Sequence, residues 1–162
     1  MVQRKKAKGN NDTMAQPGDA IAMLKADHRK VRSLFLQYKA THDPHMKQRI
    51  AAQVFAELAL TAQLEETVFY PAFAAEADEE GDCLVGGALQ AHQLFKDLIA
   101  ELRDIDDDDE FEARFQELMD HVEQHVEEEE REMFPKAEEQ LKERREDLRD
   151  EMQALKDQRV AS

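Results

Sequence analysis

Apolar side chains recur at helical spacing in four long segments of the chain. The first segment begins near Asp19, which follows Pro17-Gly18 and is of a residue type that often caps the start of a helix. It ends before Pro44, because a residue that precedes proline is pushed out of the α-helical region. The inward face of this predicted helix carries Ile21, Leu24, His28, Val31 and Phe35.

Three more amphipathic helices follow, joined by short polar turns. We expect them from about His45 into the 70s, over Asp82–Leu102 and over Glu110–Pro135, the last one preceded by the acidic turn Asp104–Glu110. The remaining segment, Lys136–Arg159, predicts a charged, exposed helix that packs through Leu141, Leu148, Met152 and Leu155. This pattern predicts an all-α fold: an up-down-up-down four-helix bundle with an additional charged C-terminal helix.

The distribution of charge divides the chain into three predicted parts. Residues 1–16 hold one arginine and three lysines and few apolar side chains, which is typical of a disordered basic N-terminal arm. Residues 17–137 contain the four amphipathic helices and form the bundle, and residues 138–162 form the charged C-terminal helix.

Composition narrows the class of protein further. With 5 glycines and 4 prolines in 162 residues, the chain has too few turn residues for a β-sandwich or barrel. No segment approaches the ~20 apolar residues of a membrane span. A single cysteine suits a reducing cytoplasm. The net charge of −15 argues against binding to a nucleic-acid backbone. We therefore expect a cytoplasmic protein that contacts neither nucleic acid nor membrane, with no protein partner identified.

An internal repeat with a period of 64 residues carries the candidate chemistry. His28 precedes His92 by this spacing, and Glu65-Glu66 precede Glu129-Glu130 by the same spacing. The following Phe69-Tyr70-Pro71 matches Met133-Phe134-Pro135. The two helix pairs are therefore predicted to be related, each bringing a histidine from one helix and a carboxylate from the next. The repeat breaks at one position, where Thr61 matches His125.

The repeated residues form a plausible set of metal ligands. His28 and His92 lie on apolar stripes and are expected to point into the bundle, while His125 and Glu129, four residues apart, share one helix face. Imidazole and carboxylate together suit iron, manganese and zinc. An inward cluster of acids also needs a cation, since unpaired buried carboxylates are costly.

Over residues 20–137 the chain resembles the hemerythrin-like HHE cation-binding domains, through the segments QLEETVFYP and HVEEEEREMFP. Such domains typically hold a non-heme di-iron centre with an oxo or hydroxo bridge inside a four-helix bundle. The resemblance implies iron as cofactor, with the two glutamates bridging the metals. The ligands that it implies are His28, Glu65, His92, His125 and Glu129. Ferritin-like proteins, the rival di-iron bundles, use Glu-x-x-His motifs, and this sequence lacks the tetrad of them.

Thr61 stands where the family has a second histidine, and three explanations remain open. The site holds two irons of unequal affinity, or it holds one metal or binds metal weakly, or His121 supplies a substitute ligand. We favour a structural role for His121, and we expect His42 and His45 beside Pro44 to be exposed.

Three functions are compatible with these features. The first is a non-heme iron protein that binds O2, NO or a similar small ligand for sensing, storage or a stress response. The second is an iron-dependent oxidase or peroxidase-like enzyme that uses the gap at Thr61. The third is a metal-poor helical interaction protein. We favour a binding protein over an enzyme, and assign no catalytic residue.

Overall fold

A computed structural model describes the chain from residue 18 to residue 161. The predicted basic arm, residues 1–16, lies outside the described residues. All the regular structure in the described part is helical, which confirms the predicted fold class. None of the described helices is long and apolar enough to cross a membrane.

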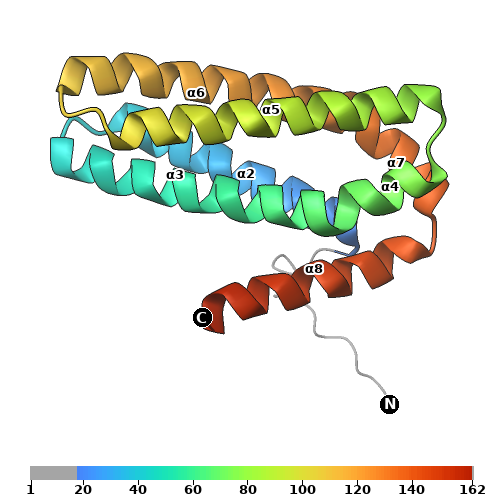
Figure 1. The fold of residues 1–162 in the computed structure, drawn as a ribbon. Helices are drawn as coiled ribbons and strands as arrows, with labels where there is room; N and C mark the ends of the chain where they lie inside the picture. The colour runs from blue at the N-terminus through green and yellow to red at the C-terminus, as the bar shows by residue number, and fades with distance from the viewer. Residues whose placement is uncertain (1–17, 162) are drawn as a thin grey trace.

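Four long helices run antiparallel along one another and form the bundle (Figure 1). They are α2 (Ala20–Ala40), α3 (Pro44–Leu64), α5 (Glu79–Arg103) and α6 (Asp108–Glu128). The chain continues beyond α3 and α6 into the short helices α4 (Tyr70–Glu76) and α7 (Phe134–Leu141) at the same end of the bundle. A fifth long helix, α8 (Arg144–Ala161), turns back alongside the bundle.

Each long helix of the bundle starts at an aspartate that caps it. The Asp19 side chain accepts a hydrogen bond from the backbone N–H of Ala22, as the sequence predicted. Asp43, Asp78 and Asp107 cap α3, α5 and α6 in the same manner. A capping oxygen satisfies one of the backbone N–H groups that the first helical turn leaves unpaired. Short loops between capped helices fix the antiparallel order.

Two short π-helical segments interrupt the long helices at equivalent positions of the 64-residue repeat. η2 (Glu65–Phe69) joins α3 to α4, and η3 (Glu129–Met133) joins α6 to α7. Each lies just before a proline, Pro71 or Pro135, which lacks an N–H group and crowds the carbonyl four residues earlier. The wider π turn accommodates this disruption, so the helix continues. The predicted fourth helix, Glu110–Pro135, therefore does not stop at its proline.

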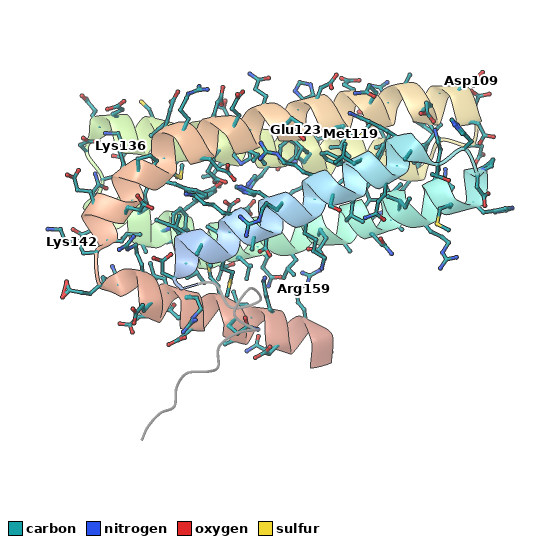
Figure 2. The ribbon with its side chains drawn as sticks, turned by 180° about the vertical axis from the view of Figure 1, so that it is seen from behind. Asp109, Met119, Glu123, Lys136, Lys142 and Arg159 are labelled. Atoms are coloured by element: carbon teal, nitrogen blue, oxygen red, sulfur yellow. The ribbon has the colours of Figure 1, made fainter. Side chains whose placement is uncertain are left out.

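Helix α8 is attached to the bundle by its apolar face. Leu148 and Met152 are buried, and Leu155 packs against the same apolar cluster, as the sequence predicted. The side chain of Lys156 bonds the buried Asp27 of α2 at 2.9 Å. The opposite face of α8 projects charged side chains into solvent (Figure 2).

Candidate metal centre

The five residues predicted as metal ligands lie together in the middle of the bundle. They come from five elements, both π segments among them: His28 from α2, Glu65 from η2, His92 from α5, His125 from α6 and Glu129 from η3. All five are buried, Glu65 with 1% and Glu129 with 3% of its surface exposed. Burial on this scale requires each charged group to find a partner.

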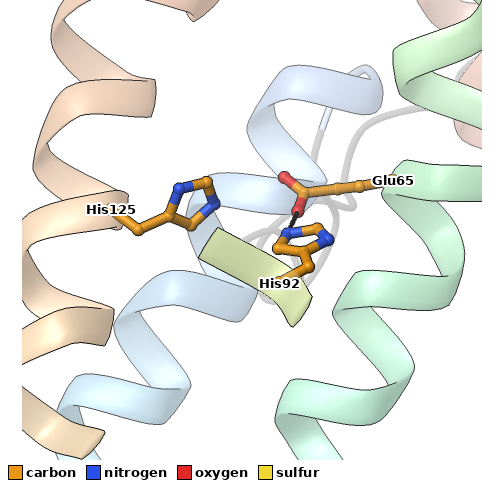
Figure 3. A group of neighbouring side chains, drawn as sticks. All are labelled: Glu65, His92 and His125. Atoms are coloured by element: carbon orange, nitrogen blue, oxygen red, sulfur yellow. Dashed lines mark ion pairs between the residues drawn. The ribbon is translucent and has the colours of Figure 1, made fainter. Parts of the chain in front are cut away.

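Their side chains form two groups that share Glu65. In one group Glu65, His92 and His125 each offer a ligand atom, and these atoms lie within 4.8 Å of one another (Figure 3). In the other group His28, Glu65 and Glu129 do the same. A carboxylate that belongs to both groups is placed to contact two neighbouring ions.

The two halves of the repeat place their histidines in matching environments. Nε2 of His28 lies 3.1 Å from Oε1 of Glu129, and Nε2 of His92 lies 3.1 Å from Oε1 of Glu65. Each imidazole thus faces the carboxylate that the other half of the repeat contributes. The 64-residue spacing in the sequence corresponds to a real two-fold similarity at the centre.

Two further carboxylates contact these imidazoles at the ring nitrogen that points away from the centre. Nδ1 of His28 lies 2.7 Å from Oε2 of Glu130, and Nδ1 of His92 lies 2.7 Å from Oε2 of Glu66. A hydrogen bond at Nδ1 leaves Nε2 to face the centre, which is how metal-binding histidines are usually oriented. Glu130, the last residue of an acidic run, is half-buried, whereas Glu127 and Glu128 are exposed.

Basic residues complete this outer layer at equivalent positions. Arg32 lies near Glu130, with Nη1 and Oε1 3.9 Å apart, and Lys96 bonds Glu66 at 3.2 Å. Arg32 and Lys96 are themselves 64 residues apart. The sequence analysis missed Glu66, Glu130 and these two cations, although the repeat that identified the histidines contains all four.

The π segments aim the carboxylates at the centre. The N–H of Tyr70 bonds the carbonyl of Glu65, and the N–H of Phe134 bonds the carbonyl of Glu129, each spanning five residues instead of four. Glu65 and Glu66 are adjacent in this wider turn, and both contact His92, Glu65 at Nε2 and Glu66 at Nδ1. π segments of this kind occur frequently at functional sites.

Tyr70 brings a hydroxyl group into the buried centre. It donates to Oε2 of Glu129 at 2.6 Å and lies 3.1 Å from Oε1 of Glu65. Its ring also stacks on His92, with ring centroids 5.5 Å apart. The equivalent residue of the second half, Phe134, stacks on His28 in the same way but has no hydroxyl group. Tyr70 is a second departure from the repeat, which the sequence analysis aligned but did not interpret.

The first departure, Thr61, borders a small internal cavity. The cavity has a volume of about 30 Å³, and its walls include Thr61, Glu65, His92 and His125. This volume exceeds the minimum that a single water-sized molecule requires. Among the described residues, Thr61 Oγ1, Glu65 Oε2 and His125 Nε2 are buried without a hydrogen-bond partner. Buried polar atoms are normally paired, so these three indicate that a ligand belongs between them.

The remaining histidines lie outside this arrangement. His121 belongs to neither of the two groups found among the described residues. It is half-buried on α6, so the hypothesis that it substitutes for a ligand gains no support. His42 and His45 are exposed beside Pro44, as expected.

The electrostatics of the centre follow from carboxylates packed against one another. Burial and the charge of Glu129 raise the pKa of Glu65 well above its usual value. Burial works against ionisation of Glu129 too, but hydrogen bonds from His28 and Glu65 lower its pKa. Burial opposes charge on His28, yet its bonds to Glu129 and Glu130 raise its pKa to about 10. His125 has no such bond, and burial lowers its pKa. The raised pKa values of Glu65 and His28 favour their protonated forms, which reduces the negative charge where these carboxylates meet.

Comparison with known proteins gives three findings. The family model described as hemerythrin HHE cation binding domain matches residues 19–137, with a second, overlapping match over residues 90–160. An uncharacterised hemerythrin-like protein of Schizosaccharomyces pombe is 31% identical over 131 residues, which cover 80% of this chain and 63% of the yeast protein. A DNA nickase of a Nostoc species is 29% identical over 116 residues, which cover 69% of this chain and 31% of the nickase.

The chain therefore spans less than two thirds of the length of these relatives. No solved structure matches the chain significantly.

Proposed function

The chain belongs to the hemerythrin HHE cation-binding domain family, and we propose that it is a non-heme iron protein that binds O2, NO or a similar small ligand. His28, Glu65, His92, His125 and Glu129 would hold the iron, and Glu65 is the carboxylate common to both groups. The observation that carries this proposal is the pair of buried His/Glu groups that share Glu65. Iron would supply the redox-active ion at which a diatomic molecule is captured.

The donor set suits such an ion. Three imidazoles and two carboxylates are ligands that iron accepts readily. Four carboxylates meet here, Glu65, Glu66, Glu129 and Glu130, while Arg32 and Lys96 are the basic side chains that face this layer. Added cations would relieve this excess of negative charge and would engage the unpaired atoms Glu65 Oε2 and His125 Nε2.

The surroundings favour a small uncharged ligand. Thr61 replaces an imidazole and borders the cavity of about 30 Å³. The walls also include Val31, Leu58 and Phe95, which exclude bulk water. A threonine hydroxyl can donate a hydrogen bond to a small bound molecule, as groups that surround metal ligands commonly do. We infer that the position left by the missing histidine is the binding position.

The first experiment measures iron in the full-length chain after anaerobic reconstitution, together with its visible absorption before and after exposure to O2 or NO. We expect between one and two irons per chain and a spectrum that changes on exposure. Less than about 0.2 iron per chain at neutral pH, where the histidine ligands can deprotonate, would contradict the proposal.

The internal repeat offers a matched pair of variants. Thr61→His gives the first half the histidine of the second half, and we expect it to raise iron content and to slow ligand capture. His125→Thr removes the remaining equivalent imidazole and should lower the iron content. If both variants hold as much iron as the parent chain, position 61 is not beside the metal.

A second candidate function is that of an iron-dependent oxidase or peroxidase-like enzyme, which the position of Tyr70 favours. Its hydroxyl group touches both inner carboxylates and could deliver a proton to a substrate there. Steady consumption of peroxide that is lost in both Tyr70→Phe and Glu65→Ala would support this function. Turnover no faster than that of free iron would exclude it.

The third hypothesis, a metal-poor interaction protein, makes the opposite prediction for stability. Without a metal, His125→Ala would have the same effect on thermal unfolding in the presence and the absence of iron. Under the iron proposal, added iron stabilises the parent chain and not the variant.

A further inference from the structure

A surface pocket lies beside the candidate metal centre, in the seam between α3 and α5. Its volume is about 320 Å³, within the range of pockets that take small organic molecules. Leu58, Ala62, His92 and Phe95 line both this pocket and the internal cavity, so the two spaces share a wall. The pocket is distinct from the five residues that would hold iron, apart from His92.

The 64-residue repeat explains why this seam is open. Across the equivalent seam between α2 and α6, Glu123 bonds Arg32 at 3.0 Å. The position equivalent to Glu123 is Ala59, so Lys96, the equivalent of Arg32, bonds only Glu66 among the described residues. The position equivalent to Val126 is Ala62. Two alanines therefore remove the bridge and the bulk that the other half places in its seam.

The pocket combines an apolar floor with charged side chains: Glu66 and Lys96, which are paired with each other, and Arg103. Phe55, Leu58, Phe95 and Ile99 supply apolar walls. Arg103 lies over the ring of Phe55, 5.5 Å from its centroid, and forms no ion pair with any described residue. Its guanidinium group is suited to binding a carboxylate.

We propose that the seam between α3 and α5 is a binding site for a small organic carboxylate with a ring-sized apolar body. The body occupies the space above Ala59 and Ala62, and the carboxylate pairs with Arg103 and, at longer range, with Lys96. This site does not depend on iron. A molecule bound there covers the wall that the pocket shares with the internal cavity, so it controls access to the candidate metal centre from this side.

The test titrates benzoate into the full-length chain, both iron-loaded and after chelation, with benzamide as the uncharged probe of the same shape. We expect saturable binding of benzoate to both forms, observed by calorimetry and, in the chelated form, by NMR shifts of residues around Phe95. Benzamide should bind about fivefold to tenfold more weakly, because it lacks the charge that a guanidinium group recognises.

Variants taken from the repeat separate this site from the metal. Ala59→Glu combined with Ala62→Val installs the residues of the closed seam and should abolish binding. Arg103→Gln, an exposed change that the fold tolerates, should weaken benzoate binding about tenfold. Lys39→Gln, at the equivalent position of the other half, should have no effect.

Two results would overturn the proposal. One is binding confined to the iron-loaded chain and unchanged by Arg103→Gln, which would place the benzoate on the metal. The other is absence of saturable binding, or equal binding to the variant with the closed seam.

Discussion

Two carboxylates that contact Nδ1 of His28 and His92 determine how these imidazole rings are oriented. Glu66 and Glu130 are partly exposed and would be regarded as surface acids from their sequence context alone. The hydrogen bond of His28 is the main reason that the pKa of Glu130 is lowered, and bonds from His92 and Lys96 outweigh burial to lower that of Glu66. Both therefore stay ionised, hold the Nδ1 proton of an imidazole and leave its Nε2 directed at the centre.

We predict that Glu130→Gln and Glu66→Gln each weaken iron binding by roughly tenfold to a hundredfold, the usual effect of removing a group that orients a metal-binding histidine. The fold should survive because neither side chain is part of an apolar cluster. Competition with a chelator of known affinity measures the change. Glu127→Gln, an exposed position in the same acidic run, is the control and should bind iron like the parent chain. Equal affinities in all three variants would contradict the orienting role.

Tyr70 leads to a second prediction at this scale. In the metal-free chain its hydroxyl group satisfies Glu129 at 2.6 Å, so Tyr70→Phe leaves that carboxylate without this donor. We expect the free energy of unfolding to fall by about 1–2 kcal/mol. Urea denaturation of the chelated protein measures it. Tyr38→Phe, whose hydroxyl group meets the exposed Glu112 at 3.3 Å, should cost less. A larger loss in Tyr38→Phe would contradict this assignment.

At the scale of helices, the sequence predicted the regular elements and missed the irregular ones. Periodic apolar residues and the capping aspartate Asp19 located the first helix, and the other three lie within a few residues of their expected ranges. The π segments were missed because one widened turn shifts the apolar spacing by a single residue, which is too small a change to stand out in a short segment. The proline that follows each of them was the available signal, but Pro71 was interpreted only as part of the repeat and Pro135 as the end of the fourth helix.

Helix α8 provides a prediction for an element outside the four-helix bundle. Lys156 bonds the buried Asp27 at 2.9 Å, and Asp27 precedes His28 in α2. Lys156→Met should lower the free energy of unfolding by about 2 kcal/mol, because it leaves a buried carboxylate unpaired. Asp27→Asn in the same chain should restore much of the loss. Urea denaturation of both variants measures this, and equal stability of the two would show that the ion pair does not anchor α8.

For the molecule as a whole, the sequence predicted which residues meet at the site, but not the contacts of the individual side chains there. The 64-residue repeat predicted which histidines and carboxylates meet, because two similar helix pairs that pack face to face place equivalent residues on a common axis. The repeat could not reveal which atoms remain unpaired, or that Ala59 opens one seam while Glu123 closes the other. Those features depend on single side chains that differ between the halves, and their effect follows only from three-dimensional packing.

The position of the centre between the two helix pairs makes the last prediction one about global stability. His28 comes from the first pair and Glu129 from the end of the second, and the same holds for Glu65 and His92. Ions bound here would therefore tie the pairs together and would bind the folded state alone. At a free iron concentration of about a hundred times Kd, this adds roughly 2.7 kcal/mol. Removing iron by chelation should then lower Tm by about 5–10 °C for a domain of this size.

The controls for this prediction separate the centre from the surface. His92→Ala removes an imidazole from the centre, so its Tm should respond little to iron, whereas the exposed His42→Ala should respond like the parent chain. Scanning calorimetry with and without chelator measures all three. A Tm of the parent chain that does not change on chelation, while iron analysis shows bound metal, would mean that the ions lie outside the interface between the pairs. The link that we infer between the repeat, the metal and the stability of the bundle would then be wrong.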